Sequence, residues 1–336
     1  MSSPREILAA QDYVEGVLSG DRSLLGRAIT LIESNAPQHQ ERAQEVLAAL
    51  LPAAGKSVRL GISGVPGSGK STLVETLGHK LTNDGHRLAV MAVDPSSSRS
   101  KGSILGDKTR MENLARDERA FIRPSPSGGT LGGVARKTRE TMVVFEAAGY
   151  DVLIVETVGV GQSEISVRGM VDFFLLVLIA GAGDELQGIK RGIIEIADAI
   201  LINKADGENR RAAEEARASY ERAIQFLSPS TAGWLTPVKS CSALHGEGIE
   251  EIWQMVEAFT AQARESGVFD ERRKRQSLEW LHGMVEERLR NAFYHDEKVR
   301  SMLDELEQEV LNDRMPVTRA AWKLLEAWHM NSKELG

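Results

Sequence analysis

The sequence predicts an α/β fold in which a mostly parallel central sheet is flanked by helices, with helical extensions at both ends. Between residues 56 and 262, short apolar runs alternate with amphipathic stretches, and Gly, Asp or Asn bounds most of the runs. This alternation is typical of successive βαβ units in a parallel sheet. Outside that region, apolar residues recur only at helical spacing. The strand-like runs are 58–62, 88–93, 120–122, 152–155, 173–178, 199–202 and 237–238.

Three regions follow from these patterns. Residues 1–55 contain two or three predicted helices, broken near Gly20 and Pro37. Residues 56–265 hold the predicted sheet, and residues 266–336 carry three apolar stripes at helical spacing. One short hairpin cannot bury stripes of this length, so they pack on the main domain or on a second subunit, and the sequence leaves both readings open.

Composition excludes several classes of protein. The chain has 336 residues, 42% of them apolar, which is enough for a sizeable core. Its 41 basic and 48 acidic residues are interleaved and give a net charge of −7, so a nucleic-acid-binding face is not expected. The longest apolar run, 173–180, is too short to cross a bilayer, and the N-terminus lacks a signal core. We therefore expect a cytoplasmic protein without a membrane or nucleic-acid partner.

A complete G-x-x-x-x-G-K-[ST] phosphate loop is the strongest motif. It follows a predicted strand and opens a helical pattern, which is the context that distinguishes it from a chance match. Its glycines allow backbone N–H groups to surround the β-phosphate, while Lys70 bridges the β- and γ-phosphates and the Ser71 hydroxyl ligates Mg²⁺. The fold is therefore predicted to be that of a P-loop NTPase. The nucleotide-binding residues are Gly64, Val65, Pro66, Gly67, Ser68, Gly69, Lys70, Ser71 and Thr72.

A second motif, Asn-Lys-Ala-Asp, indicates which base is bound. The Asp206 carboxylate can accept hydrogen bonds from N1–H and N2–H of guanine, a pair of donors that adenine lacks. Asn203 would tie this loop to the phosphate loop, and the stem of Lys204 would cover the base. A polar turn that happens to spell these letters is the alternative. A further loop after the next strand is expected to offer a backbone N–H to the guanine carbonyl; it consists of Ser242, Ala243 and Leu244.

Acidic residues that follow predicted strands supply the candidate metal ligands. Glu156 and Asp94 each come directly after a strand, and Asp107 lies in the polar loop beyond Asp94. The carboxyl ends of parallel strands share one sheet edge, which is also where Ser71 is expected. We expect Ser71, Asp94, Asp107 and Glu156 to hold Mg²⁺, while a solvated role remains open for Asp107.

Together these residues resemble the MeaB type of GTPase metallochaperone, which serves adenosylcobalamin-dependent methylmalonyl-CoA mutase. The matching stretches are GVPGSGKST (64–72), VDPSS (93–97), GSILGDKTRM (102–111), ETVGVGQSE (156–164), AGAGDELQGIK (180–190) and NKAD (203–206). GSILGDKTRM and GDELQGIK distinguish this family from others better than the phosphate loop does, because many unrelated proteins share the phosphate loop. The resemblance extends over nearly the whole chain.

The resemblance implies a partner and an assembly. It implies a homodimer formed through the C-terminal arm 266–336, the four magnesium ligands named above, and a partner-responsive loop at 180–190, often called switch III. The function that the resemblance implies is to gate the loading of cofactor into methylmalonyl-CoA mutase and to protect or reactivate that enzyme. GTP hydrolysis would time these steps. It leaves open whether the cobalamin adenosyltransferase also binds.

The expected catalytic groups are Lys70, Glu156 and Lys190. Many GTPases place a water-orienting Gln where this chain has Val160, so slow intrinsic hydrolysis is expected, completed by a partner or by a mobile cation. Lys190, at the end of the loop 180–190, is the candidate cation, and a solvated surface Lys is the alternative reading.

Two other functions remain open. A P-loop kinase that phosphorylates a small acceptor is the first, and Asn203 and Asp206 argue against it because such a kinase has no use for a guanine-reading loop. The second is a nucleotide-dependent scaffold without turnover. No short-range cluster of His or Cys indicates a transition-metal or cobalamin site on this chain, whose single cysteine is Cys241.

Overall fold

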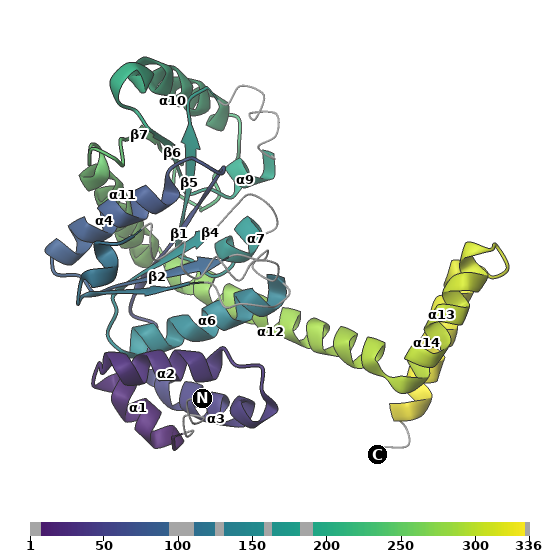
Figure 1. The fold of residues 1–336 in the computed structure, drawn as a ribbon. Coiled ribbons are helices and arrows are strands. Elements are labelled where there is room, and N and C mark those ends of the chain that lie inside the picture. The colour runs from purple at the N-terminus through teal and green to yellow at the C-terminus, as the bar shows by residue number, and fades with distance from the viewer. Residues whose placement is uncertain (1–7, 94–110, 125–130, 158–162, 182–190, 333–336) are drawn as a thin grey trace. The chain divides into compact units, whose positions relative to one another are not determined.

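The computed structural model describes residues 8–93, 111–124, 131–157, 163–181 and 191–332, and the chain divides into two compact units, Met1–Lys274 and Arg275–Gly336 (Figure 1). The strands are β1 (Val58–Gly64), β2 (Leu88–Val93), β3 (Ala120–Arg123), β4 (Val152–Thr157), β5 (Phe173–Ile179), β6 (Ala199–Asn203) and β7 (Val238–Ser240). The helices are α1 (Ala10–Leu18), α2 (Arg22–Ile32), α3 (Pro37–Leu50), α4 (Lys70–Asn83), α6 (Leu131–Ala147), α7 (Ser163–Arg168), α9 (Arg191–Glu195), α10 (Arg210–Ile224), α11 (Ile249–Glu265), α12 (Val268–His295), α13 (Glu297–Leu311) and α14 (Val317–Ser332). Short 3-10 turns are η1 (Leu51–Ala53), η2 (Leu114–Arg116) and η3 (Gly207–Asn209).

A parallel sheet forms the centre of the first unit. Within the described residues its order is β3-β2-β4-β1-β5-β6-β7, and every neighbouring pair is parallel. Each predicted run therefore forms a strand. The last strand begins at Val238 rather than at Pro237, because Pro has no N–H to donate; the Pro237 carbonyl still accepts a hydrogen bond of 3.0 Å from Ile200 N.

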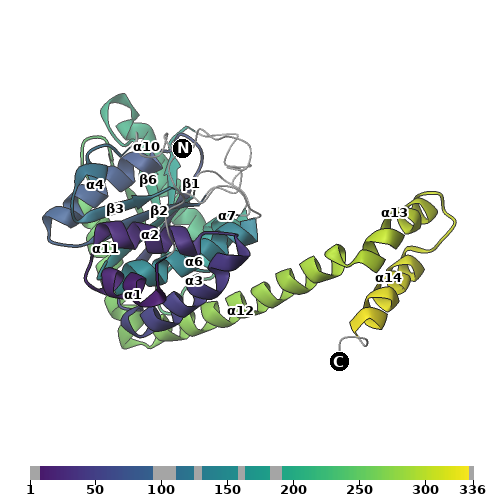
Figure 2. The ribbon, with the colours of Figure 1, turned by 60° about the horizontal axis from the view of Figure 1, so that its bottom comes forward.

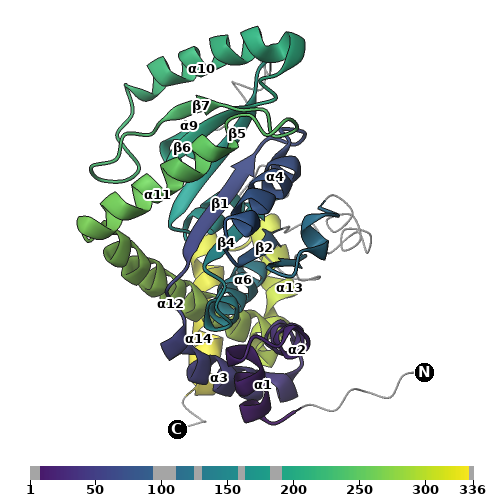
Figure 3. The ribbon, with the colours of Figure 1, turned by 90° about the vertical axis from the view of Figure 1, so that its left-hand side faces the viewer.

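Helices cover both faces of this sheet. On one face α4 and α11 pack against the alternate residues Phe173, Leu175 and Val177 of β5, whereas Phe174 and Leu176 point to the other face, toward α6 and α7. Burial on both faces explains why β5 reads as a continuous apolar run. Figure 3 shows α10 beside β7, at the end of the sheet away from α1–α3.

The N-terminal region forms three helices that pack against α6 (Figure 2). Asp21 caps α2 by accepting hydrogen bonds from Ser23 N at 2.7 Å and Leu24 N at 2.9 Å. Gly16 permits the close approach of α1 and α2, since a Cβ there would overlap the Leu24 side chain. Buried residues of all three helices join the core on the α6 face of the sheet.

In the second unit, α13 and α14 form a helical hairpin beside the C-terminal part of α12. Phe293 and Trp328 meet edge to face at 5.7 Å between ring centroids, and Asp296 caps α13 through Lys298 N and Val299 N. Four apolar residues of α12 remain exposed along one helical stripe: Leu278, Leu281, Val285 and Leu289. No described helix is long and apolar enough to cross a membrane.

Candidate functional site

The phosphate loop links the end of β1 to the start of α4, and its shape depends on glycine. Gly64, Gly67 and Gly69 have φ values of 155°, 78° and 86°. A Cβ at Gly64 would overlap the carbonyl oxygen of Val177, and one at Gly69 would lie 2.6 Å from Asn203 Nδ2. The loop is therefore confined between β5 and the end of β6.

Two polar side chains inside this loop are arranged as a phosphate site requires. Lys70 is 6% exposed, and its Nζ donates hydrogen bonds to the carbonyl oxygens of Gly64 at 2.8 Å and Val65 at 3.2 Å. The Ser68 hydroxyl is buried and has no hydrogen-bond partner in the described part of the chain. An unpaired buried hydroxyl is costly, and a phosphate oxygen placed in the loop would satisfy it.

A hydroxyl and a carboxylate meet beside the loop. Ser71 Oγ donates a hydrogen bond of 3.0 Å to Glu156 Oε1, and Glu156 is only 6% exposed. Hard oxygen ligands of this kind fit Mg²⁺, which usually takes one or two protein oxygens together with nucleotide phosphates. Among the residues that the structure describes, no cluster of three or more His, Cys, Asp or Glu side chains could hold a metal by itself. The oxygen pair of Ser71 and Glu156 is thus of the kind that holds Mg²⁺ together with nucleotide phosphates.

Several residues of the predicted site lie outside the described residues. They are Asp94, Asp107, Val160 and Lys190. Their roles remain predictions from the sequence.

Asn203, at the end of β6, joins the phosphate loop to the loop after β7. Its Nδ2 donates to Ser68 O at 2.7 Å, and its Oδ1 accepts from Ala243 N at 3.0 Å. Asn203 is 2% exposed. The phosphate-binding and base-binding loops thus share one buried amide, which fixes the distance between them.

The Asp206 carboxylate is oriented by a residue of the loop after β7. Ser242 Oγ donates a hydrogen bond of 2.5 Å to Asp206 Oδ2. Lys204 is exposed and takes the left-handed conformation, with φ of 61°. Burial raises the pKa of Cys241, next to Ser242, to about 12, so its thiol stays protonated and unreactive at neutral pH.

The sequence predicts that a backbone N–H of the loop Ser242–Leu244 donates to guanine. Two of the three N–H groups in this loop already donate to other residues of the protein. Ser242 N donates to Glu247 O at 3.0 Å, and Ala243 N is taken by Asn203. In the described part of the chain, the amide of Leu244 makes no hydrogen bond. Leu244 N–H is therefore the donor that the loop leaves for a ligand.

Sequence reasoning missed Thr76, which anchors the same loop from α4. Thr76 Oγ1 donates to the Ala243 carbonyl at 2.8 Å. The two residues are far apart in the chain and Thr76 belongs to no motif, so only the packing of α4 against the loop after β7 reveals the contact.

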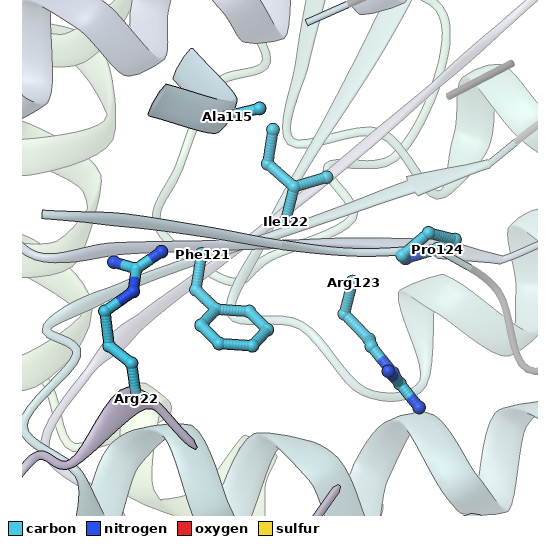
Figure 4. A pocket seen from close by; sticks show the side chains of 6 residues that line it. All are labelled: Arg22, Ala115, Phe121, Ile122, Arg123 and Pro124. Carbon is cyan, nitrogen blue, oxygen red and sulfur yellow. The ribbon is translucent and has the colours of Figure 1, made fainter. Parts of the chain in front are cut away.

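A cavity of about 270 Å³ lies elsewhere, at the outer edge of β3 (Figure 4). Figure 4 shows Phe121 and Arg123 on one side of the strand and Ile122 on the other. Arg22 donates to Glu118 O at 2.6 Å and Arg123 Nε to Glu33 Oε1 at 3.1 Å, so the protein itself engages both guanidinium groups. No residue of the candidate nucleotide site lines this cavity.

Comparison with known proteins gives consistent matches. The family model described as "Methylmalonyl Co-A mutase-associated GTPase MeaB" matches residues 25–298. A probable GTPase of Mycobacterium tuberculosis is 48% identical over 326 residues, covering 96% of this chain and 97% of its own. GTPase ArgK of Escherichia coli is 50% identical over 286 residues, covering 85% and 86%.

Two further matches extend the comparison. A mouse protein named "Methylmalonic aciduria type A homolog, mitochondrial" is 45% identical over 323 residues, covering 93% of this chain and 78% of its own. A crystal structure described as "LAO/AO transport system kinase" superposes with a TM-score of 0.79 at 39% identity, covering 96% of this chain and 99% of the other.

Proposed function

The chain belongs to the MeaB family of methylmalonyl-CoA mutase-associated GTPases, and from this premise we propose that it is a GTP-driven switch acting on such a mutase. It is a P-loop GTPase that hydrolyses GTP. The observation that best supports the switch is the buried Asn203, which makes the phosphate loop and the guanine loop one unit. This arrangement argues against the kinase alternative.

Hydrolysis begins with rearrangement of Lys70. Its ammonium group must leave the carbonyls of Gly64 and Val65 to reach the β- and γ-phosphates, where it neutralises charge that grows in the transition state. Mg²⁺, when bound, would supply further neutralisation of the same phosphates. Ser71 and Glu156 would hold it, and we propose that Asp94 and Asp107 complete its environment.

Base recognition belongs to the other half of the site. The Asp206 carboxylate, oriented by Ser242, would accept both guanine N–H groups, and Leu244 N–H would donate to the guanine carbonyl. Lys204, held in its left-handed conformation, would cover the face of the base. Adenine would leave the Asp206 carboxylate without donors.

Coupling to the partner is the finer part of the proposal. We propose that methylmalonyl-CoA mutase orders the loop 180–190 and brings Lys190 to the phosphates, so that GTP hydrolysis times cofactor loading, protection or reactivation. The names of the family and of the mouse relative support the choice of partner. The cytoplasm is the proposed compartment.

The exposed stripe of α12 supports a proposed homodimer. Leu278, Leu281 and Leu289 are 58%, 54% and 52% exposed, at a spacing that places them on one helix face. Two such stripes would bury each other in a symmetric dimer. In the full-length chain, Leu281→Arg should convert the dimer to a monomer in light scattering. A parent protein that is monomeric at micromolar concentration would exclude the dimer.

The test of the switch uses purified mutase and full-length protein. The protein should capture the mutase in the presence of a non-hydrolysable GTP analogue, and the mutase should accelerate GTP hydrolysis. A parallel assay with the cobalamin adenosyltransferase tests the second candidate partner. Lys190→Ala should leave basal hydrolysis nearly intact and remove the acceleration. Absence of both capture and acceleration with the parent protein would refute the proposed partner while leaving GTP hydrolysis untouched.

A further inference from the structure

The hydroxyl of Thr76 connects α4 to the loop after β7. Thr76 Oγ1 donates a hydrogen bond of 2.8 Å to the carbonyl oxygen of Ala243, 167 residues further along the chain. Ala243 is 1% exposed, and within the described residues no other donor reaches its carbonyl. Buried carbonyl groups of folded proteins are almost always hydrogen-bonded. The Thr76 hydroxyl therefore supplies the partner that this carbonyl requires.

A second carbonyl competes for the same hydroxyl. Thr76 Oγ1 also lies 3.0 Å from the carbonyl oxygen of Thr72, one turn earlier on α4. A hydroxyl has one hydrogen to donate, and a carbonyl inside a helix already accepts the amide four residues later. The Ala243 carbonyl has no such alternative among the described residues, so the hydrogen contributes most when it is donated to Ala243.

The direction of the Leu244 amide follows from this contact. The Ala243 carbonyl and the Leu244 N–H belong to one planar peptide group, and in a trans peptide they point in opposite directions. A bond that orients the carbonyl therefore orients the amide. On the other side of Ala243, its own N–H donates to Asn203 Oδ1 at 3.0 Å. Both peptide groups that flank Ala243 are thus held, and Leu244 N–H is aimed in a fixed direction.

Other contacts keep the loop attached to the protein. Ser242 and Glu247 exchange two backbone hydrogen bonds, of 3.0 and 3.1 Å, which close the loop. Ile249, at the start of α11 directly after the loop, is buried in the same core as Leu77 of α4. Because these contacts do not involve Thr76, its hydroxyl has the narrower task of orienting one peptide group.

We propose that Thr76 is a positioning residue for recognition of the guanine carbonyl at C6, acting through the peptide group between Ala243 and Leu244. Without the hydroxyl, the buried Ala243 carbonyl lacks a donor, and this cost favours rotation of the peptide group. Rotation turns Leu244 N–H away from the base. The inference rests on the proposed function, because it refines the base site that was assigned there.

The experiment compares three diphosphates that differ only in their base. GDP and inosine diphosphate carry the carbonyl at C6, whereas 2-aminopurine riboside diphosphate lacks it. Thr76→Val keeps the shape of the side chain and removes the hydroxyl. In calorimetry on the full-length chain, it should weaken binding of GDP and inosine diphosphate by about 3- to 10-fold, the effect of one neutral hydrogen bond. Binding of the 2-aminopurine nucleotide should stay at the parent value.

Three companion variants separate positioning from folding. Thr76→Ser keeps the hydroxyl and should bind all three diphosphates as the parent does. Thr76→Ala, a second variant without the hydroxyl, should repeat the selective loss. Thr30→Val is the matched control on α2, because the Thr30 hydroxyl donates to Gly26 O at 2.8 Å within its own helix and lies outside the nucleotide loops. It should leave the three affinities unchanged.

Steady-state hydrolysis adds a second readout. Thr76→Val should raise KM for GTP with little change in kcat, because the base is recognised less well while the phosphate site is intact. Thermal melting without nucleotide establishes that each variant is folded.

The outcomes distinguish three cases. An equal loss of affinity for all three diphosphates would show that Thr76 only stabilises the fold, and the inference would be wrong. Unchanged binding of GDP by folded Thr76→Val would also overturn it. If the parent protein itself binds GDP and the 2-aminopurine nucleotide equally, the proposed base site fails first, and the inference fails with it.

Discussion

Both edges of the central sheet carry buried polar groups, but the two edges use them differently. At the carboxyl edge, the Ser68 hydroxyl has no hydrogen-bond partner among the described residues, and Lys70 Nζ donates to loop carbonyls whose place a phosphate can take. At the amino edge, the buried carboxylates of Asp198, Asp172 and Glu146 are satisfied by arginines and amides of the protein itself. The first edge is arranged for a ligand and the second is closed.

Asp198 shows how completely the amino edge is satisfied. Its carboxylate pairs with Arg168 at 3.0 Å and accepts hydrogen bonds from Phe174 N at 2.9 Å, Ser230 at 2.9 Å and Thr231 at 2.5 Å. The Asp172 carboxylate similarly accepts a hydrogen bond of 2.6 Å from Arg273 Nη2. This ion pair fixes the first turns of α12 to the sheet. Buried charge alone therefore does not mark a functional site, because these carboxylates are buried and yet engaged by the protein itself.

Removing a carboxylate from the closed edge should have the largest effect on stability. Asp198→Ala removes the fully buried carboxylate that pairs with Arg168 and with the buried Arg272, and breaking such a pair typically costs about 3–5 kcal/mol. Urea unfolding should show this loss, while the GDP affinity of the folded fraction stays unchanged. Glu250→Ala, at an exposed carboxylate that pairs with the half-buried Lys80, is the matched control and should change stability little. Equal losses in the two variants would contradict the comparison.

Lys70→Ala should produce the reverse pattern at the open edge. Loss of one charge-stabilising group typically lowers kcat by about 10²- to 10³-fold, because that charge is needed most in the transition state. The free energy of unfolding should change far less than in Asp198→Ala, since the hydrogen bonds of Lys70 to Gly64 O and Val65 O lie within one loop, whereas Asp198 joins distant segments of the chain. Steady-state GTP hydrolysis and urea unfolding measure the two effects. Near-normal turnover would place the catalytic site elsewhere.

Removing the Asp206 carboxylate should weaken guanine binding by a smaller factor than the fall in kcat expected for Lys70→Ala. Hydrogen bonds to a charged group contribute about 1.5–3 kcal/mol, so Asp206→Asn should weaken GDP binding by about 10- to 100-fold and strengthen binding of xanthosine diphosphate. Ser242→Ala removes only the hydroxyl that orients the carboxylate and should cause a milder loss with guanine preference retained. Calorimetry with both diphosphates measures these changes; equal binding of ADP and GDP by the parent protein would exclude this reading.

The smallest expected effect is the response of the closed edge to acid. Burial raises the pKa of Glu146, but Arg59, Ser57 and Gly55 N outweigh this, so its pKa lies below the usual value. The ionised carboxylate then contributes stability above its unfolded pKa of about 4.3, and this contribution is lost as pH falls through the lower folded pKa. Urea unfolding between pH 6 and pH 3 should show this loss, and Glu146→Gln should flatten it. An unchanged pH profile in the variant would contradict the assignment.

Much of this protein could be inferred from local patterns in its sequence. Continuous apolar runs identified the strands, because a strand that is buried on both faces carries apolar residues at every position. The phosphate loop and the Asn-Lys-Ala-Asp motif could be recognised because each consists of residues adjacent in the chain. Parallel strand order also implied that the loops after β1, β4 and β6 meet at one edge, where the structure places Ser71, Glu156 and Asn203.

Other features were decided only by tertiary structure. Glu75 meets Asn113 and Thr76 meets Ala243 because α4 packs beside both segments, and neither contact has a signature in the sequence. Arg272 and Arg273 belong to no motif in the sequence, yet the fold buries Arg272 and pairs Arg273 with Asp172, 101 residues away. Local patterns record what each residue prefers, whereas the partner of a buried polar group depends on which distant segment the folded chain brings within hydrogen-bond distance.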